Sequence, residues 1–118
     1  MLYTVFTVGD KEYKLRATAS SIIEIEKRLG GKNPLDILMA IEGGELPPVS
    51  SILYILHGSM QKFHSKTDLQ RVMQIYDEYI EAGNTYMDII KVLMDVFRVS
   101  GFFATAPKTE QEEETAEE

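Results

Sequence analysis

The segment YMDIIKVLMDVFRVSGFF, residues 86–103, decides how this chain folds. At 100° per residue, its large apolar residues between 89 and 97 cover roughly 200° of the circumference of an α-helix. They are Ile89, Ile90, Val92, Leu93, Met94, Val96 and Phe97. A helix this apolar is either the central element of its own fold or a docking surface for another protein. Our hypothesis is that it carries more apolar surface than its own chain can cover, which leaves Ile89, Val92 and Val96 for a partner.

At the other end of the chain, residues 2–17 predict a β-hairpin. If Gly9-Asp10 is a two-residue turn, the facing pairs are Val8 and Lys11, Phe6 and Tyr13, and Thr4 and Leu15. A lone two-stranded ribbon is marginal in water. We therefore expect it to pack on helices, with an unprotected edge that can pair with another chain.

Two short helices are predicted next from their start and stop residues. Thr18 is a suitable N-cap for a helix from about 19 to 29, which Gly30-Gly31 ends. Asn33-Pro34 opens a second helix, with asparagine as the cap and proline at the first helical position, and Gly43-Gly44 stops it.

Two longer amphipathic helices follow. The first runs from 49 to about 64, and its core stripe leaves Tyr54 and Ile55 to one side. Thr67 begins a capping-box pattern for the second, which Gly83 ends. Its predicted core stripe is Leu69, Val72, Met73, Tyr76, Tyr79 and Ile80. Asn84 or Thr85 then caps the last helix. The fold class we predict is α+β, mainly helical, with about five helices and an N-terminal β-hairpin.

The composition changes sharply after Phe103. Residues 104–118 hold six glutamates against one lysine, Lys108, and therefore carry −5 of the net charge of −7. Without apolar periodicity this segment cannot offset its ordering entropy by burial. We predict one globular domain over residues 1–103 and a disordered acidic tail over 104–118.

Composition also limits the classes of function. The chain has no cysteine, which excludes disulfides and thiolate zinc sites. It has no basic stripe for nucleic acid, no signal peptide, and no apolar run near the ~20 residues that cross a bilayer. We expect a cytosolic protein that binds neither nucleic acid nor membrane.

The side chains capable of catalysis or metal binding form no recognisable cluster. His57 and His64 lie seven residues apart, whereas helical metal ligands usually lie four apart. No nucleophile motif or converging carboxylate pair is present. We therefore predict no enzymatic activity, no cofactor and no metal. The six methionines and six tyrosines are compatible with two interpretations: they fill the core, or they form an adaptable contact surface.

Four stretches in a fixed order carry a family resemblance. They are TVFTVGDKEYKLR, IIEIEKRLGGKNPLDIL, LYILHGSMQKFH and DIIKVLMDVFRVSGFF, followed by the glutamate-rich end. In this order the chain resembles the small tail assembly chaperones of long-tailed phages and prophages of Gram-positive bacteria. The resemblance runs over nearly the whole chain, although no single motif is diagnostic.

The resemblance implies a specific role. Such proteins are not enzymes. They coat and solubilise the tape measure protein in the host cytoplasm, self-associate, and are usually absent from the finished virion. In many relatives a ribosomal frameshift appends a second domain that recruits the tail tube protein, and this chain is similar to the short, unshifted product.

Other classes of function stay open. The chain could be a structural tail or connector component of the virion, or a small bacterial protein-binding adaptor. For a role in protein binding, the candidate contact residues are Tyr54, Ile55, Ile89, Val92, Val96, Phe102 and Phe103.

Overall fold

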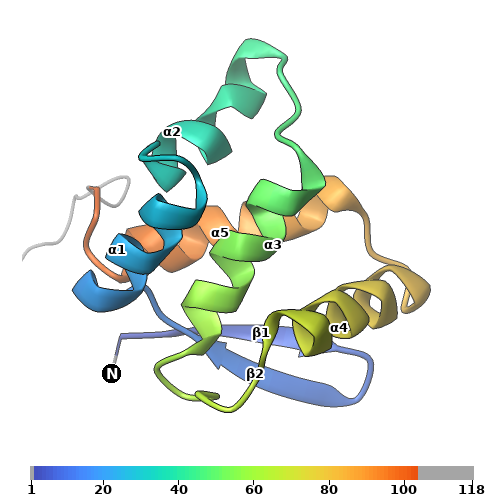
Figure 1. The fold of residues 1–118 in the computed structure, drawn as a ribbon. Helices are drawn as coiled ribbons and strands as arrows, with labels where there is room; N and C mark the ends of the chain where they lie inside the picture. Colours follow the sequence, from blue (N-terminus) through green and yellow to red (C-terminus); the bar gives the residue numbers. More distant parts are fainter. Residues whose placement is uncertain (1, 104–118) are drawn as a thin grey trace, which may run out of the picture.

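The structure of the chain is a computed structural model that describes residues 2–103. The elements in chain order are β1 (Thr4–Val8), β2 (Lys11–Leu15), α1 (Ala19–Arg28), α2 (Pro34–Met39), the 3-10 helix η1 (Ala40–Gly43), α3 (Val49–Met60), α4 (Leu69–Glu81) and α5 (Tyr86–Val99). The fold is α+β and mainly helical, as predicted (Figure 1). The predicted acidic tail, residues 104–118, lies outside the described residues.

The hairpin has the predicted register. Val8 pairs with Lys11, Phe6 with Tyr13, and Thr4 with Leu15 in an antiparallel ladder. Gly9 adopts a φ of 62° in the turn, a value that glycine reaches without steric cost. The alternation buries Phe6, Val8 and Leu15 against the helices, and the Phe6 ring lies 4.9 Å from that of Tyr79 on α4.

One of the two hairpin edges is covered by the chain itself, so the expectation of an unprotected edge is wrong for β2. The amide of Arg16 donates to the carbonyl oxygen of Ser59 (2.8 Å), and the amide of Lys14 donates to Nε2 of His64 (3.0 Å). The β1 edge differs. Val5 and Thr7 stand opposite Lys14 and Glu12, so their backbone groups point away from β2. In the described part of the chain, no hydrogen bond reaches the outer backbone groups of these two residues.

Helix α5 crosses the middle of the molecule, and α2, α3 and β1 all pack against it (Figure 1). The hypothesis that Ile89 and Val96 stay uncovered by their own chain is therefore wrong. Ile89 and Val96 are fully buried and Val92 is half-buried, while Met87 and Lys91 are its exposed residues. The prediction assumed that one sector of the helix meets the fold, whereas three elements approach it from different directions. A polar residue of α5 also contacts the hairpin, because Thr4 Oγ1 donates a hydrogen bond to the Asp95 carboxylate (3.0 Å).

Helix α3 is also covered on more sides than its sequence stripe predicted. It contacts α1, α4, α5 and β2, and Ile55, which lies off the stripe, is fully buried. The approach to α1 is so close that a Cβ at Gly58 would collide with the Ile25 side chain. The helix ends at Met60, four residues earlier than predicted.

Helix α4 is rotated relative to its predicted stripe. Its buried residues are Val72, Ile75 and Tyr79, whereas Met73 is 44% exposed and Ile80 36% exposed. Asp68 caps the helix by accepting from the Arg71 amide, one residue after the predicted cap. Other start signals are confirmed, since Thr18, Asn33 and Thr85 cap α1, α2 and α5.

Candidate protein-binding surfaces

The seven predicted contact residues do not form one surface. Ile55, Ile89 and Val96 are fully buried, so in this fold they cannot meet a partner. Tyr54 is half-buried on α3, where the Arg28 guanidinium lies 5.7 Å from its ring centroid. Val92, also half-buried, lies near the middle of α5, and Phe102 and Phe103 follow the end of that helix.

The two phenylalanines have a local explanation. Gly101 adopts a φ of 90° and donates its amide to the Arg98 carbonyl (3.1 Å), and the Phe102 amide donates to the Phe97 carbonyl (3.0 Å). These two bonds form a Schellman motif, which typically brings the residue after the glycine onto the last turn of the helix. The Phe102 ring accordingly packs edge-on against Phe97, with 5.6 Å between centroids. Phe103 packs against the core.

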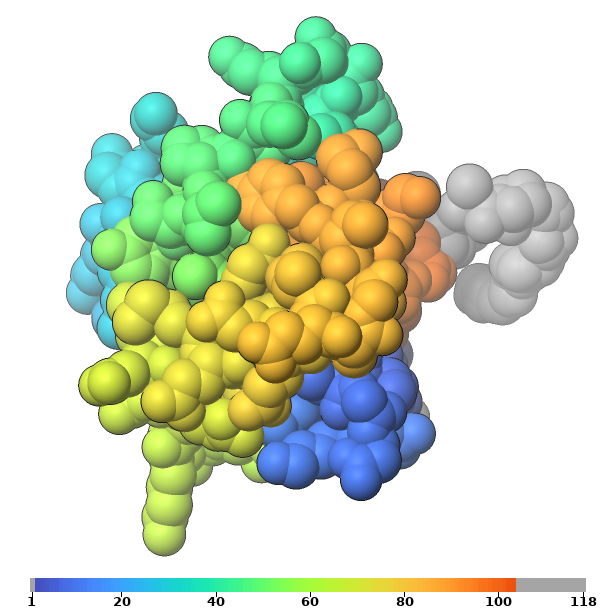
Figure 2. All heavy atoms as spheres, turned by 90° about the vertical axis from the view of Figure 1, so that its right-hand side faces the viewer, coloured from blue at the N-terminus to red at the C-terminus, as the bar shows by residue number. Residues whose placement is uncertain are grey.

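Uncovered apolar residues occur on α4 and on the segments next to it. On α4, Tyr76, Ile80 and Met73 lie at successively greater angles from the core-facing side, all on the same flank. Met87 is the second residue of α5, Val49 is the first residue of α3, and Leu46 lies three residues before Val49. Figure 2 shows α4, the loop after it, the start of α5 and the start of α3 side by side on one face of the molecule. We call this the α4 face; the segments that form it carry the exposed apolar residues Leu46, Val49, Met73, Ile80 and Met87.

Tyr86 joins two segments of the α4 face, and Tyr76 lies near it. The Tyr86 hydroxyl donates to the Pro47 carbonyl (2.5 Å), which connects the start of α5 to the segment before α3. Burial, together with the neighbouring Tyr76, raises the pKa of Tyr86 to about 12. Burial also raises the pKa of Tyr76. Both hydroxyls are therefore neutral at physiological pH, and neither adds charge to this apolar face.

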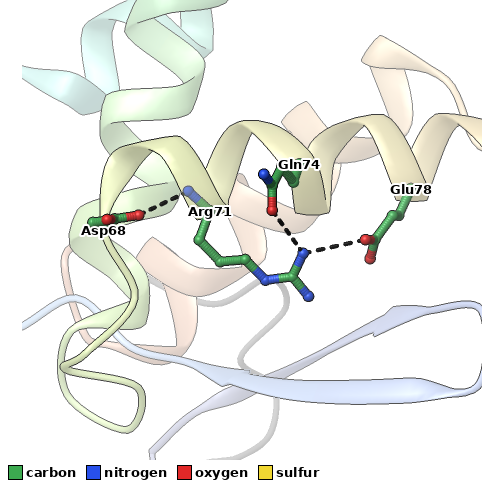
Figure 3. A network of polar contacts seen from close by, with 4 residues as sticks. All are labelled: Asp68, Arg71, Gln74 and Glu78. Atoms are coloured by element: carbon green, nitrogen blue, oxygen red, sulfur yellow. Dashed lines mark hydrogen bonds and ion pairs between the residues drawn. The ribbon is translucent and has the colours of Figure 1, made fainter.

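The opposite flank of α4 is polar. Arg71 donates to Gln74 (3.3 Å) and pairs with Glu78 (3.2 Å), next to the Asp68 cap. In Figure 3 these side chains lie along the side of α4 that faces the hairpin. Arg71 and Glu78 are paired with each other, although their side chains are 37% and 43% exposed. Both flanks of α4 therefore reach solvent, and the exposed apolar residues Met73 and Ile80 lie on the other one.

The two histidines make separate structural contacts. Nε2 of His57 lies 3.0 Å from the carbonyl oxygen of Thr67 and donates to it, so Nδ1 accepts from Nη1 of Arg28 (2.8 Å). His64 accepts the Lys14 amide at Nε2 and packs against the Tyr13 ring. Burial lowers the pKa of both histidines, and the neighbouring charges of Arg28 and Lys14 lower it further. Within residues 2–103 no three potential ligand side chains converge on a point where they could hold a metal ion.

Comparison with known proteins places the chain in a family. It belongs to the family of unknown function DUF6096, whose profile matches residues 3–117. No curated protein and no solved structure matches the chain. Among the described helices, none has both the length and the apolar character that crossing a membrane requires.

Proposed function

We propose that the chain is a phage tail assembly chaperone that binds and solubilises the tape measure protein and helps to recruit the tail tube protein. Support comes from the sequence resemblance over nearly the whole chain and from one structural observation, the uncovered apolar side chains of the α4 face. A tape measure protein is long and largely helical and presents repeated apolar helical faces. An apolar face built from helical segments is suited to such a partner.

The expected strength of each contact fits a temporary coat. A fully exposed apolar side chain contributes about 1.5–3 kcal/mol when it is buried completely, so residues that are already partly covered contribute roughly 1 kcal/mol each. Association also costs translational and rotational freedom. One copy therefore binds weakly, whereas many copies along one partner bind with high avidity. Weak individual contacts allow tube subunits to displace the coat one copy at a time.

Self-association has a second surface available to it. The outer edge of β1 is open, Val5 is 48% exposed, and the strand TVFTV carries no charge. Charged residues and coverings are the usual protection of edge strands. A second copy can pair its own β1 along this edge while both α4 faces stay free for the partner.

The proposed role requires a long helical protein encoded beside the gene, and co-expression of the chain with that protein tests this function. We expect the wild-type chain to co-purify with that protein as a high-mass complex on sizing. In the double variant Met73→Asp/Ile80→Asp we expect at least about tenfold less recovery, because two apolar contacts are lost and two charges would need to be desolvated. Circular dichroism of the variant should match the wild type, since both positions are on the surface.

The matched control is Ile23→Asp. Ile23 is an exposed isoleucine on α1, outside the α4 face, so its replacement should leave recovery unchanged. Equal loss in both variants would remove the α4 face as the binding surface. Absence of a neighbouring long helical reading frame, or stoichiometric amounts of the chain in mature particles, would contradict the chaperone role and favour an adaptor or a structural virion component, respectively.

A further inference from the structure

A groove of about 660 Å³ runs between α1 and α3. Its lining includes Ile25 and Gly58, where the helices lie so close together that a Cβ at Gly58 would collide with Ile25. Arg28, His57 and Lys62 line it, and Thr18 and Ser20 line the part next to the start of α1. Glu24 is the one carboxylate among the lining residues, and it pairs with Lys27 (3.5 Å). The uncompensated charge of the groove is therefore positive.

Arg28 is held in position without being neutralised. Its Nη1 donates to His57, and its guanidinium lies over the Tyr54 ring. Both of these partners are uncharged, because the His57 hydrogen bonds require a neutral ring. The ion pairs within residues 2–103 are Lys27–Glu24, Arg71–Glu78 and Arg98–Asp95, and Arg28 is in none of them. A guanidinium has five N–H donors in a fixed fork, so a positioned Arg28 retains donors for a carboxylate.

The end of the described chain lies beside the groove. The Oγ of Ser100, just after α5, accepts a hydrogen bond from the Ala17 amide (3.0 Å). Ala17 is the residue before Thr18, which lines the groove. Figure 1 shows this end of α5 next to α1. Fifteen residues follow Phe103, enough to span about 50 Å when extended. Helix α1, with ten residues, is only about 15 Å long.

We propose that the groove between α1 and α3 is a binding site for an acidic peptide, and that its occupant is the chain's own segment 104–118, whose glutamates pair with Arg28 and Lys62. Charge complementarity supports this occupant, because the segment carries −5 and the groove contains the positioned Arg28 and the exposed Lys62, neither of which belongs to an ion pair within residues 2–103. The point at which the described chain ends supports it too. This proposal does not depend on the tail assembly function.

Paramagnetic NMR on the full chain tests the proposal. Since the chain has no cysteine, Glu114→Cys introduces a single attachment point for a nitroxide. We expect the label to broaden the backbone amides of groove residues such as Thr18, Arg28 and Gly58. Salt at ~1 M should abolish the broadening, because it shortens the screening length to about 3 Å. Arg28→Glu in the same protein should reduce the broadening about two- to fivefold, as expected for loss of one exposed ion pair.

Lys32→Glu is the matched control. It reverses a charge four residues further along the chain, at an exposed side chain that does not line the groove and is in none of the ion pairs of residues 2–103. Broadening that survives Lys32→Glu and falls in Arg28→Glu supports the groove. An equal fall in both variants would indicate general charge attraction and would overturn the proposal, as would no broadening at all. Binding between copies is detected in a sample that mixes spin-labelled chains with isotope-labelled chains. Broadening of equal size in that sample would mean that the groove binds segment 104–118 of a second copy and not that of its own chain.

Discussion

Helices α4 and α5 follow each other in the chain and differ in how their apolar residues are used. Helix α5 is apolar around much of its circumference, yet nearly all of it is covered because α2, α3 and β1 approach it from several sides. Helix α4 has a narrower apolar arc, yet part of that arc, at Met73 and Ile80, stays uncovered. The apolar content of a helix therefore does not indicate how much of it remains exposed. The number of elements packed around the helix decides that.

The largest difference in stability is expected when a charged residue is placed on each of the two helices in turn. Val96→Asp puts a carboxylate at a fully buried position of α5 and should cost about 4 kcal/mol or more, enough to unfold much of a marginally stable domain. Met73→Asp on α4 should cost under about 1 kcal/mol, as is usual for surface changes. Urea unfolding monitored by circular dichroism measures both. A folded Val96→Asp chain of near wild-type stability would show that α5 is not the centre of the core.

Two isoleucines within α4 sharpen the comparison. Ile75 is 1% exposed and faces the core, whereas Ile80 lies on the uncovered flank. Ile75→Ala should destabilise the domain by about 2–4 kcal/mol, the transfer and cavity cost of a buried isoleucine. Ile80→Ala should cost under about 1 kcal/mol, because partial exposure leaves less apolar area to lose. Urea unfolding midpoints of the two variants measure this difference in stability. Similar midpoints would mean that Ile75 and Ile80 are equally buried, so that the core-facing side of α4 lies between them.

The smallest expected effect concerns pH. Both histidines have a pKa below the ordinary value of 6.5 in the folded chain, so the unfolded chain binds more protons near that pH. Linkage then makes the free energy of unfolding fall as pH drops through 6.5 toward the folded-state pKa values, and the stabilisation is fully present well above 6.5. Denaturant titrations at pH 7.5 and 5.5 should show this loss, and His57→Gln should reduce it. An unchanged pH dependence in His57→Gln would assign the effect to other groups.

Local features of this fold were accessible from the sequence. Alternation and a glycine turn predicted the hairpin register, and side chains able to accept backbone N–H groups predicted the caps at Thr18 and Asn33. At the start of α4 the prediction was off by one residue, since Thr67 and Asp68 are both competent caps and Asp68 accepts the Arg71 amide. Such signals are short-range, so the printed sequence contains most of what determines them.

The placement of apolar surface could not be predicted in the same way. The arc of α4 includes Met73 and Ile80 on one side and Ile75 on the other, and only the position of α3 and the hairpin selects Ile75 for the core. Ile55, Ile89 and Val96 failed as contact residues for the same reason, because elements distant in sequence cover them. The α4 face was missed because Met73 and Ile80 were predicted to belong to the core stripe of their helix. The signal that could have revealed it is that Met73 and Ile80 lie at the edge of the apolar arc of this helix, where coverage by the fold is least certain.

The contacts on the β2 edge bear on how large an assembly this chain can build through its strands. Ser59 and His64 occupy the amides of Arg16 and Lys14, so a strand from another molecule would have to displace these bonds to add on the β2 side. Two molecules paired through β1 along a twofold axis, as proposed above, would form a four-stranded sheet with this partly occupied edge on both outer sides. Further addition of strands would then be disfavoured, and crowding on a long polymer would favour pairs over fibrils.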